Sequence, residues 1–350
     1  MDLFLCDYGE GCHPNILKAL ERTNLEQTHG YGMDPHCDHA RALIKEACQA
    51  PEADVHFLVG GTQTNTTVIA SILRPHQGAL CADSGHINVH ETGAIESTGH
   101  KVLPLPAENG KLSADTIEKA IAAHRKDESF EHIVQPGLVY ISHPTEYGTL
   151  YTRAELEAIS GVCRSAGVPL FVDGARLGYG LAADGTDVTL PVLAELADVF
   201  YIGGTKVGAL FGEAVVITNP AWKQDFRYLI KQRGGMLAKG RLLGIQFEEL
   251  MTDGLYTQLG RHADELAYRV RDIFRAAGYP MLFDSPTNQQ FPILPDADYA
   301  VLRSTSEGEF WTRVDESHSA IRFCTSWCTT KEAVDRLEAA VSALMQAKEY

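Results

Sequence analysis

The chain has 350 residues, of which 45% are hydrophobic and 22% are charged, as is ordinary for a globular protein. Its formal net charge is −16 and it has no block of basic residues, which argues against nucleic acid or an anionic membrane surface as a partner. No apolar run approaches the roughly 20 residues that cross a bilayer. The first seven residues lack the basic start and apolar core of a signal peptide, so we expect a cytoplasmic protein.

The eight cysteines are scattered and include no C-x-x-C pair. A chain of this size does not need disulfide bonds, so reduced thiols are expected. The segment His36-Cys37-Asp38-His39 holds metal-binding residue types, but no second Cys/His pair follows at a zinc-finger interval. A polar helix start explains the segment equally well, and we expect no metal site.

Short apolar segments alternate with helical ones from about residue 50 to 220, after an expected arm of residues 1–15 that contains two glycines and a proline. Ser113 and the capping box Thr152-x-x-Glu155 mark two helix starts. Apolar strands separated by helices are typical of an α/β fold with a mostly parallel, here seven-stranded, sheet. We assign this large domain to residues 16–235. Its strands are predicted at 54–59, 78–82, 101–105, 137–142, 168–172, 199–202 and 214–218.

The pattern changes after Asn219-Pro220, and residues 224–277 are amphipathic and helical apart from Gly234-Gly235. A closing helix is expected from the box Thr329-x-x-Glu332, because an apolar stripe follows it. Residues 236–350 are therefore predicted to form a smaller α+β domain. Its short strands are predicted at 280–283, 290–294 and 320–325.

Two predicted strands end abruptly in charged residues. The segment FYIGGTK ends in Lys206, and the segment VDGAR carries Asp173 and Arg176. A lysine at the end of a buried strand is placed to condense with an aldehyde, and a neighbouring aspartate could hold a pyridinium nitrogen. Pyridoxal phosphate (PLP) needs both groups, so the pair suggests a PLP enzyme. Taken singly, Lys206 also fits a surface lysine and Asp173 a helix cap.

Three further sites follow predicted strands. Gly60, Gly61 and Thr62 form a tight turn before a helix, where backbone N–H groups suit one phosphate, although such turns also occur for structural reasons. His86 could stack on a flat ring and move protons, and Glu146 could act as a shielded base. Ligands gather at the carboxyl ends of parallel strands, which is where all of these residues are expected.

Taken in order, these segments resemble the threonine aldolase group of fold-type I PLP enzymes, to which phenylserine aldolase also belongs. The similarity runs from Asp7 to the closing helix. The matching segments are HGYGMD at 29–34, GGTQTN at 60–65, GHIN at 85–88, ETGA at 91–94, VDGAR at 172–176 and GTK at 204–206.

The resemblance implies a role for each candidate residue, with Lys206 bound covalently to the cofactor and Asp173 at its pyridine nitrogen. The catalytic residues would be Lys206, His86, Glu146 and Asp173. The cofactor contacts would be Gly60, Gly61, Thr62, His86, Asp173, Arg176, Thr205, Lys206, Arg233 and Lys239. The substrate contacts would be Cys6, Tyr31, Arg176 and Arg322. Family members are homodimers or homotetramers with shared active sites, and Tyr31, Arg233 and Lys239 are the candidates for residues supplied by a neighbour.

Two positions depart from the family pattern. Cys6-Asp7-Tyr8 stands where many threonine aldolases have Ser-Asp-Thr, so a thiol replaces the hydroxyl expected at the substrate carboxylate. Glu146 stands where many have a second histidine, as in phenylserine aldolase-like sequences. The base could therefore be Glu146 or His86.

The implied reaction is retro-aldol cleavage of a β-hydroxy-α-amino acid, such as L-threonine or L-allo-threonine, to glycine and an aldehyde. A β-eliminating lyase or an aminotransferase on the same fold is the alternative, and it would release a keto acid. A PLP-binding protein without catalysis is a weaker alternative. A nicotinamide dehydrogenase would leave Lys206 without a role, and its glycine motif is missing.

Overall fold

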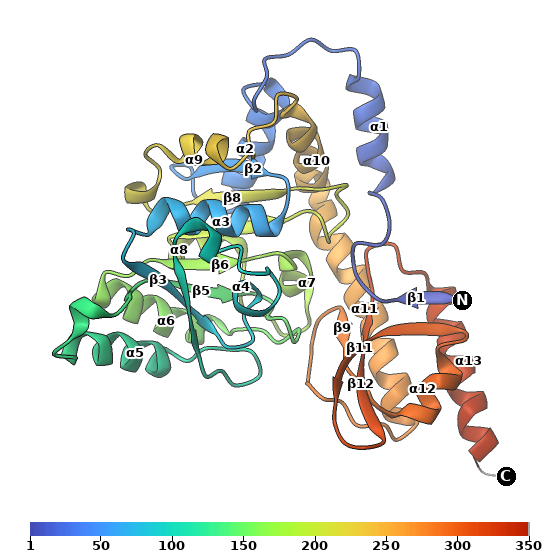
Figure 1. Ribbon diagram of the computed structural model, residues 1–350. Helices are drawn as coiled ribbons and strands as arrows, with labels where there is room; N and C mark the ends of the chain where they lie inside the picture. Colours follow the sequence, from blue (N-terminus) through green and yellow to red (C-terminus); the bar gives the residue numbers. More distant parts are fainter. Residues whose placement is uncertain (349–350) are drawn as a thin grey trace.

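The seven apolar segments predicted between residues 54 and 218 form one sheet in the computed structural model, which describes residues 1–348 (Figure 1). The spatial order is β2-β8-β7-β6-β5-β3-β4. Strand β8 runs antiparallel to β2 and β7, while the other neighbours pair in parallel. The mostly parallel α/β prediction is confirmed. The strands are β2 (Asp54–Leu58), β3 (Gln77–Ala82), β4 (Lys101–Leu105), β5 (Gln135–Ser142), β6 (Leu170–Asp173), β7 (Val199–Gly203) and β8 (Glu213–Ile217).

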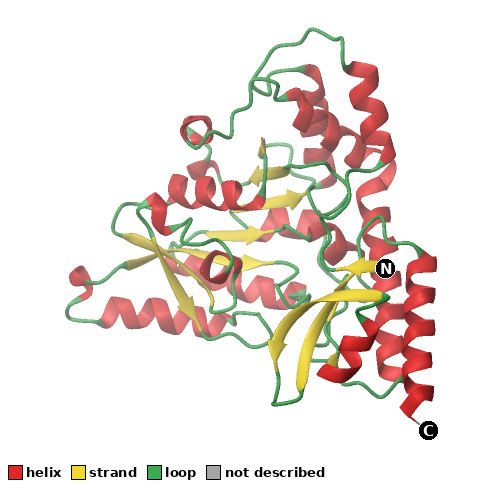
Figure 2. Cartoon of the chain, turned by 45° about the vertical axis from the view of Figure 1, so that its right-hand side comes forward, coloured by secondary structure: helices red, strands yellow, loops and turns green. Residues whose placement is uncertain are grey.

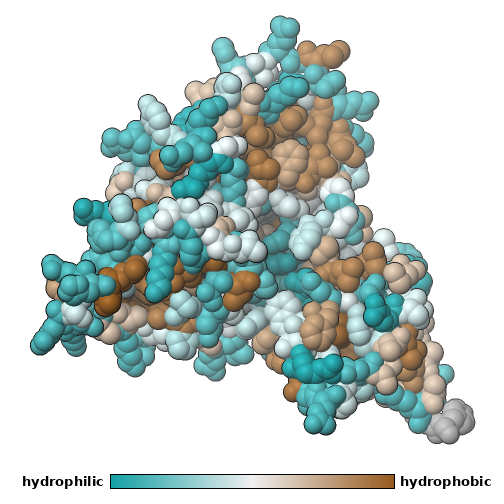
Figure 3. Space-filling model, in the orientation of Figure 1, coloured by the Kyte–Doolittle hydropathy of each residue, from teal (hydrophilic) through white to brown (hydrophobic). Residues whose placement is uncertain are grey.

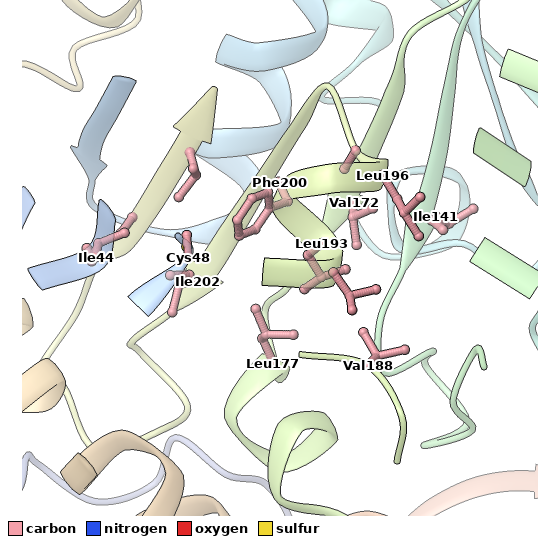
Figure 4. Close-up of a cluster of buried hydrophobic side chains, with 14 of the residues drawn as sticks. Ile44, Cys48, Ile141, Val172, Leu177, Val188, Leu193, Leu196, Phe200 and Ile202 are labelled. Atoms are coloured by element: carbon pink, nitrogen blue, oxygen red, sulfur yellow. The ribbon is translucent and has the colours of Figure 1, made fainter. Parts of the chain in front are cut away.

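Helices cover both faces of this sheet, as Figure 2 shows. Successive side chains of a strand point to opposite faces, so Phe200 and Ile202 enter one core and Val199 and Tyr201 enter the other. Figure 4 shows the first of these cores around Phe200. The helices are α1 (Pro14–Thr23), α2 (Pro35–Ala47), α3 (Gly61–Ile72), α4 (His86–Val89), α5 (Ala114–Lys126), α6 (Arg153–Ala166), α7 (Leu177–Ala182), α8 (Leu190–Leu196), α9 (Phe226–Gln232) and α10 (Arg241–Met251).

Two of the three N-terminal helix caps predicted from the sequence are present in the structure. The Ser113 side chain caps α5, and Thr152 and Glu155 form the predicted capping box of α6. The box predicted at Thr329 is wrong. The Thr330 hydroxyl accepts from the Ala333 N–H at the start of α13, while the Thr329 hydroxyl accepts from the Ser326 N–H.

A second, smaller sheet has the order β1-β11-β12-β10, with β9 also paired to β12. The strands predicted at 290–294 and 320–325 are present with small shifts, while residues 280–283 make a single bridge, Met281 to Pro292. The sequence did not reveal β11, because half of its side chains are exposed and few are apolar. The strands are β1 (Asp2–Phe4), β9 (Gln289–Gln290), β10 (Ile293–Pro295), β11 (Ser306–Arg313) and β12 (His318–Cys324), and the helices are α11 (Leu255–Ala276), α12 (Asp296–Leu302) and α13 (Lys331–Lys348).

The first residues are part of this small sheet, whereas the sequence predicted an arm. Strand β1 pairs in parallel with β11. Phe4 is 1% exposed and its ring lies 5.9 Å from that of Phe323. Three residues are too few to show a strand period, so the apolar anchor Phe4 was not recognised.

Helix α11 belongs to both hydrophobic cores. Its residues up to Ala263 pack in the core of the large sheet, and from Leu266 onward they pack in the core of the small sheet. The large-sheet core also includes Leu243 and Phe247 of α10. The division of the chain at residue 236 stays a prediction. Among the described helices, none is long and apolar enough to cross a membrane.

Replacement of Phe4 tests the attachment of β1. We expect Phe4→Ala to cost about 3–5 kcal/mol, because it empties a filled site in the small core. Leu3→Ala is the control, since Leu3 is 60% exposed, and it should change stability by less than about 0.5 kcal/mol. Urea unfolding of both variants measures the difference. Equal stabilities would contradict the role of Phe4 as the anchor.

Candidate active site

Most of the residues singled out in the sequence line one cavity of about 220 Å³ at the carboxyl ends of the parallel strands. This is the edge at which α/β sheets bind ligands. These residues come from five different strands, because successive crossovers return the chain to the same edge of the sheet. The cavity is lined by Gly60, Gly61 and Thr62 after β2, His86 after β3, Glu146 after β5, Asp173 and Arg176 after β6, and Thr205 and Lys206 after β7.

Asp173 is held by four hydrogen bonds. Its Oδ1 accepts from the Tyr201 hydroxyl at 2.5 Å and from the Ala175 N–H at 2.9 Å. Its Oδ2 accepts from the Tyr140 hydroxyl at 2.5 Å and from the Asn65 Nδ2 at 3.1 Å. These donors fix the orientation of a carboxylate that is only 3% exposed. The sequence did not indicate a role for these three residues, because Tyr140 and Tyr201 lie in apolar strands and Asn65 lies in a run of polar residues at the start of α3.

The Lys206 side chain ends in the cavity. Among residues 1–348, its Nζ makes no hydrogen bond or salt bridge. Burial lowers the pKa of Lys206, and the nearby charge of Arg176 lowers it further. A lowered pKa increases the share of the neutral amine, which is the nucleophilic form.

Arg176 is fixed by a buried carboxylate. Its Nε and Nη2 donate to the two oxygens of Asp7, at 2.8 and 3.0 Å, and the Asn288 Nδ2 also donates to Asp7. Burial alone would raise the pKa of Asp7, but the charges of Arg176 and Lys206 hold it below its usual range. Asp7 was not among the predicted site residues, because an acidic residue near the start of a chain gives no signal of burial.

Glu146 and His86 are in contact. The Glu146 Oε1 accepts from the His86 backbone N–H at 2.9 Å and from the Ser142 hydroxyl at 2.7 Å. Burial raises the pKa of Glu146. The His86 ring lies beside a second carboxylate, with Nδ1 at 2.7 Å from the Glu91 Oε1. Both candidates for the base therefore border the same cavity.

The glycine turn Gly60-Gly61-Thr62 and Thr205 both line the cavity. Helix α3 starts at Gly61 and has no side-chain cap, so its first N–H groups are available to an anion. A Cβ on Gly61 would lie 3.2 Å from the Tyr201 hydroxyl, so the turn fits closely there. The Thr205 hydroxyl donates to the Glu213 Oε1 at 2.8 Å, and burial raises the pKa of Glu213 to about 8. Glu213 is a cavity residue that the sequence did not reveal.

A second cavity of about 290 Å³, called the outer cavity below, adjoins the first and is lined by Arg322. Its guanidinium pairs with Glu309 and donates to the Leu5 carbonyl at 2.9 Å and to the Gln289 Oε1 at 3.1 Å. The two cavities share His86, Glu146, Arg176 and Lys206. The outer cavity is also lined by Tyr8, His90 and Trp311.

Four predicted residues do not line either cavity within one chain: Cys6, Tyr31, Arg233 and Lys239. Tyr31 lies on the surface, with its ring 4.8 Å from the Lys231 Nζ. The segment that starts at His36 begins α2, and both His36 and His39 contact Glu248. In the described part of the chain, no group of three His, Cys, Asp or Glu side chains is arranged to hold a metal.

The family model described as beta-eliminating lyase matches residues 9–324. The chain belongs to this family. It is 31% identical to the low specificity L-threonine aldolase of Pseudomonas sp. (strain NCIMB 10558) and 29% identical to that of Pseudomonas aeruginosa, over 98% of both chains in each case. Within the beta-eliminating lyase family it therefore falls in the threonine aldolase group, as the sequence motifs predicted.

Solved structures agree with this assignment. The structure of the Leishmania major threonine aldolase is 45% identical in sequence to this chain and superposes on it with a TM-score of 0.96. The match covers 99% of this chain and 100% of the Leishmania chain. A Thermus thermophilus aspartate aminotransferase shares the fold alone, at 12% identity and a TM-score of 0.71 over 98% of this chain and 91% of that one. The predicted fold-type I architecture is confirmed.

The contribution of the Asp7–Arg176 ion pair to stability can be measured by comparing two Asp→Asn variants, one in this pair and one in a surface pair. Asp7→Asn leaves Arg176 buried without a counter-charge, which should cost about 3–5 kcal/mol in urea unfolding. Asp2→Asn removes a pair of the same geometry with Arg336 at the surface and should cost less than about 1 kcal/mol. Similar losses for both variants would contradict the buried role of Asp7.

Proposed function

We propose that this chain is a PLP-dependent aldolase that cleaves a β-hydroxy-α-amino acid, of the L-threonine or L-allo-threonine type, to glycine and an aldehyde. One observation carries the proposal: an amine, Lys206, and a carboxylate, Asp173, face a cavity that adjoins two arginines, Arg176 and Arg322. The full-length similarity to threonine aldolases supports the same reaction.

The residues present fit PLP. The uncapped start of α3, with Gly60, Gly61 and Thr62, offers N–H donors to a phosphate, and Thr205 lines the same cavity. Asp173 is an oriented acceptor for the pyridine nitrogen, since four donors fix its carboxylate. The Lys206 amine has no competing partner among the described residues. When bound, PLP supplies an electron sink for the Cα–Cβ bond of the substrate.

The two arginines suit the substrate carboxylate, because a guanidinium binds a carboxylate through two parallel hydrogen bonds. Arg176 borders both cavities and keeps its position through Asp7. Arg322 borders the outer cavity, where the substrate carboxylate would replace Glu309 as its partner. Fixing the carboxylate in this way also sets which bond at Cα lies in the reactive orientation.

Proton transfer falls to His86 and Glu146. Either the His86 Nε2 or a Glu146 oxygen would accept the proton of the β-hydroxyl as the aldehyde leaves. The raised pKa of Glu146 makes its carboxylate a stronger base than an exposed one. Lys206 has a lowered pKa because of its burial and of the nearby Arg176 charge, so its amine gives up a proton more readily than an exposed lysine.

We further propose a homodimer or homotetramer with shared active sites. Tyr31, Arg233 and Lys239 lie outside the cavities of their own chain, which leaves them available to a neighbour. Figure 3 shows apolar side chains gathered over α10 in the upper part of the molecule, a surface suited to a second copy. The large apolar side chains exposed between residues 9 and 35 are Leu17, Leu25, Tyr31 and Met33.

The products decide between the proposed reaction and its alternative. PLP-loaded protein incubated with L-threonine, L-allo-threonine and L-phenylserine should release glycine and aldehyde in equal amounts from at least one of them. The retro-aldol reaction conserves every substrate atom in these two products. A keto acid in place of glycine would instead establish a β-eliminating lyase or an aminotransferase on this fold.

Lys206→Ala should lower the rate of cleavage at least about a thousandfold, because it removes the nucleophilic amine. Borohydride reduction followed by peptide mass spectrometry should locate the cofactor on Lys206 in the parent protein and on no peptide of the variant. Lys223→Ala, a lysine outside both cavities, is the matched control and should keep rate and label. Labelling at another lysine would contradict the assignment.

A further inference from the structure

Glu91 is a buried carboxylate that the proposed reaction does not use. It follows α4, and its side chain is fully buried. Its Oε1 contacts the His86 Nδ1 at 2.7 Å and accepts from the Asn65 Nδ2 at 2.7 Å. Its Oε2 is buried without a partner among the described residues. Burying a carboxylate is unfavourable, so this placement requires a compensating role.

Asn65 connects Glu91 to the opposite side of the site. The same Asn65 Nδ2 that donates to Glu91 also donates to the Asp173 Oδ2 at 3.1 Å. Asn65 lies on α3, the helix whose start is the phosphate turn, and it is fully buried. His86, Glu91, Asn65 and Asp173 therefore form one continuous chain of hydrogen bonds.

This chain determines what His86 presents to the cavity. A carboxylate at Nδ1 accepts a hydrogen bond, so the proton of the neutral ring resides on Nδ1 and the lone pair on Nε2. The backbone N–H of His86 is fixed in turn by Glu146. With its backbone and one ring nitrogen held, the ring directs Nε2 away from Glu91 and keeps one orientation.

We propose that Glu91 is a positioning residue that acts through His86. It fixes the proton on Nδ1, makes Nε2 the proton-accepting atom, and ties the ring through Asn65 to Asp173. The proposal deepens the proposed function and rests on it for the identity of the reaction. The orientation of the ring itself is a property of the chain without cofactor.

A double-mutant cycle tests whether Glu91 acts through His86. In PLP-loaded protein, Glu91→Gln should lower kcat per bound PLP about tenfold or more and leave KM within about twofold. In a His86→Phe background, which keeps a flat ring, Glu91→Gln should cause no further loss of kcat and no further change in the PLP dissociation constant. Losses that multiply in the double variant would overturn the proposal. Glu118→Gln, an exposed glutamate on α5, is the control.

Ring ¹⁵N NMR of the PLP-free protein gives a readout that does not depend on catalysis. The His86 signals, assigned by their absence in His86→Gln, should show a proton on Nδ1 above neutral pH. In Glu91→Ala they should show exchange between both tautomers. An unchanged tautomer would overturn the positioning role even if cleavage occurs, and a changed one would support it even if none of the amino acids is cleaved. If Glu91→Gln does not fold, Glu91→Asp, which is one methylene shorter, replaces it in the cycle with the same expected loss.

Discussion

The guanidinium of Arg176 is largely buried just past the end of β6, and the fully buried Asp7 carboxylate provides the counter-charge that stabilises it there. The pair joins three parts of the chain. Asp7 follows β1 and Arg176 follows β6 of the large sheet. Asn288, which also donates to Asp7, lies next to β9 of the small sheet. The same N-terminal segment supplies the Leu5 carbonyl to Arg322. Both arginines therefore depend on the first seven residues for their positions.

The site as a whole balances several buried charges within a small volume. The cations of Arg176 and Arg322 are paired with carboxylates, and Asp173 is surrounded by neutral donors. Lys206 and Glu146 instead respond to burial by shifts in pKa toward their neutral forms. The groups fixed as ions suit binding, and the groups with shifted pKa values suit proton transfer.

The sequence predicted the large sheet and the position of the site well, because both depend on local patterns. Apolar strands such as the one before Lys206, and glycine turns such as Gly60-Gly61, are recognisable without knowledge of the fold. The contacts that support the site were not predictable, because the pairing of Asp7 with Arg176, of Glu91 with His86 and of Glu213 with Thr205 appears only once the chain is folded. Strand β11 was missed because its exposed, polar face gives little hydrophobic signal.

The first half of helix α11 packs in the core of the large sheet and the second half packs in the core of the small sheet. A single uninterrupted helix therefore connects the two sheets. A rotation of one sheet against the other would bend this helix or pull its apolar side chains out of a core, which is unfavourable in a close-packed interior. If Arg322 binds the substrate carboxylate as proposed, that carboxylate would take the place of the half-exposed Glu309 side chain while the two sheets keep their positions. On this proposal, substrate entry would cost the single ion pair between Arg322 and the half-exposed Glu309, and would need no rearrangement of the cores that α11 joins.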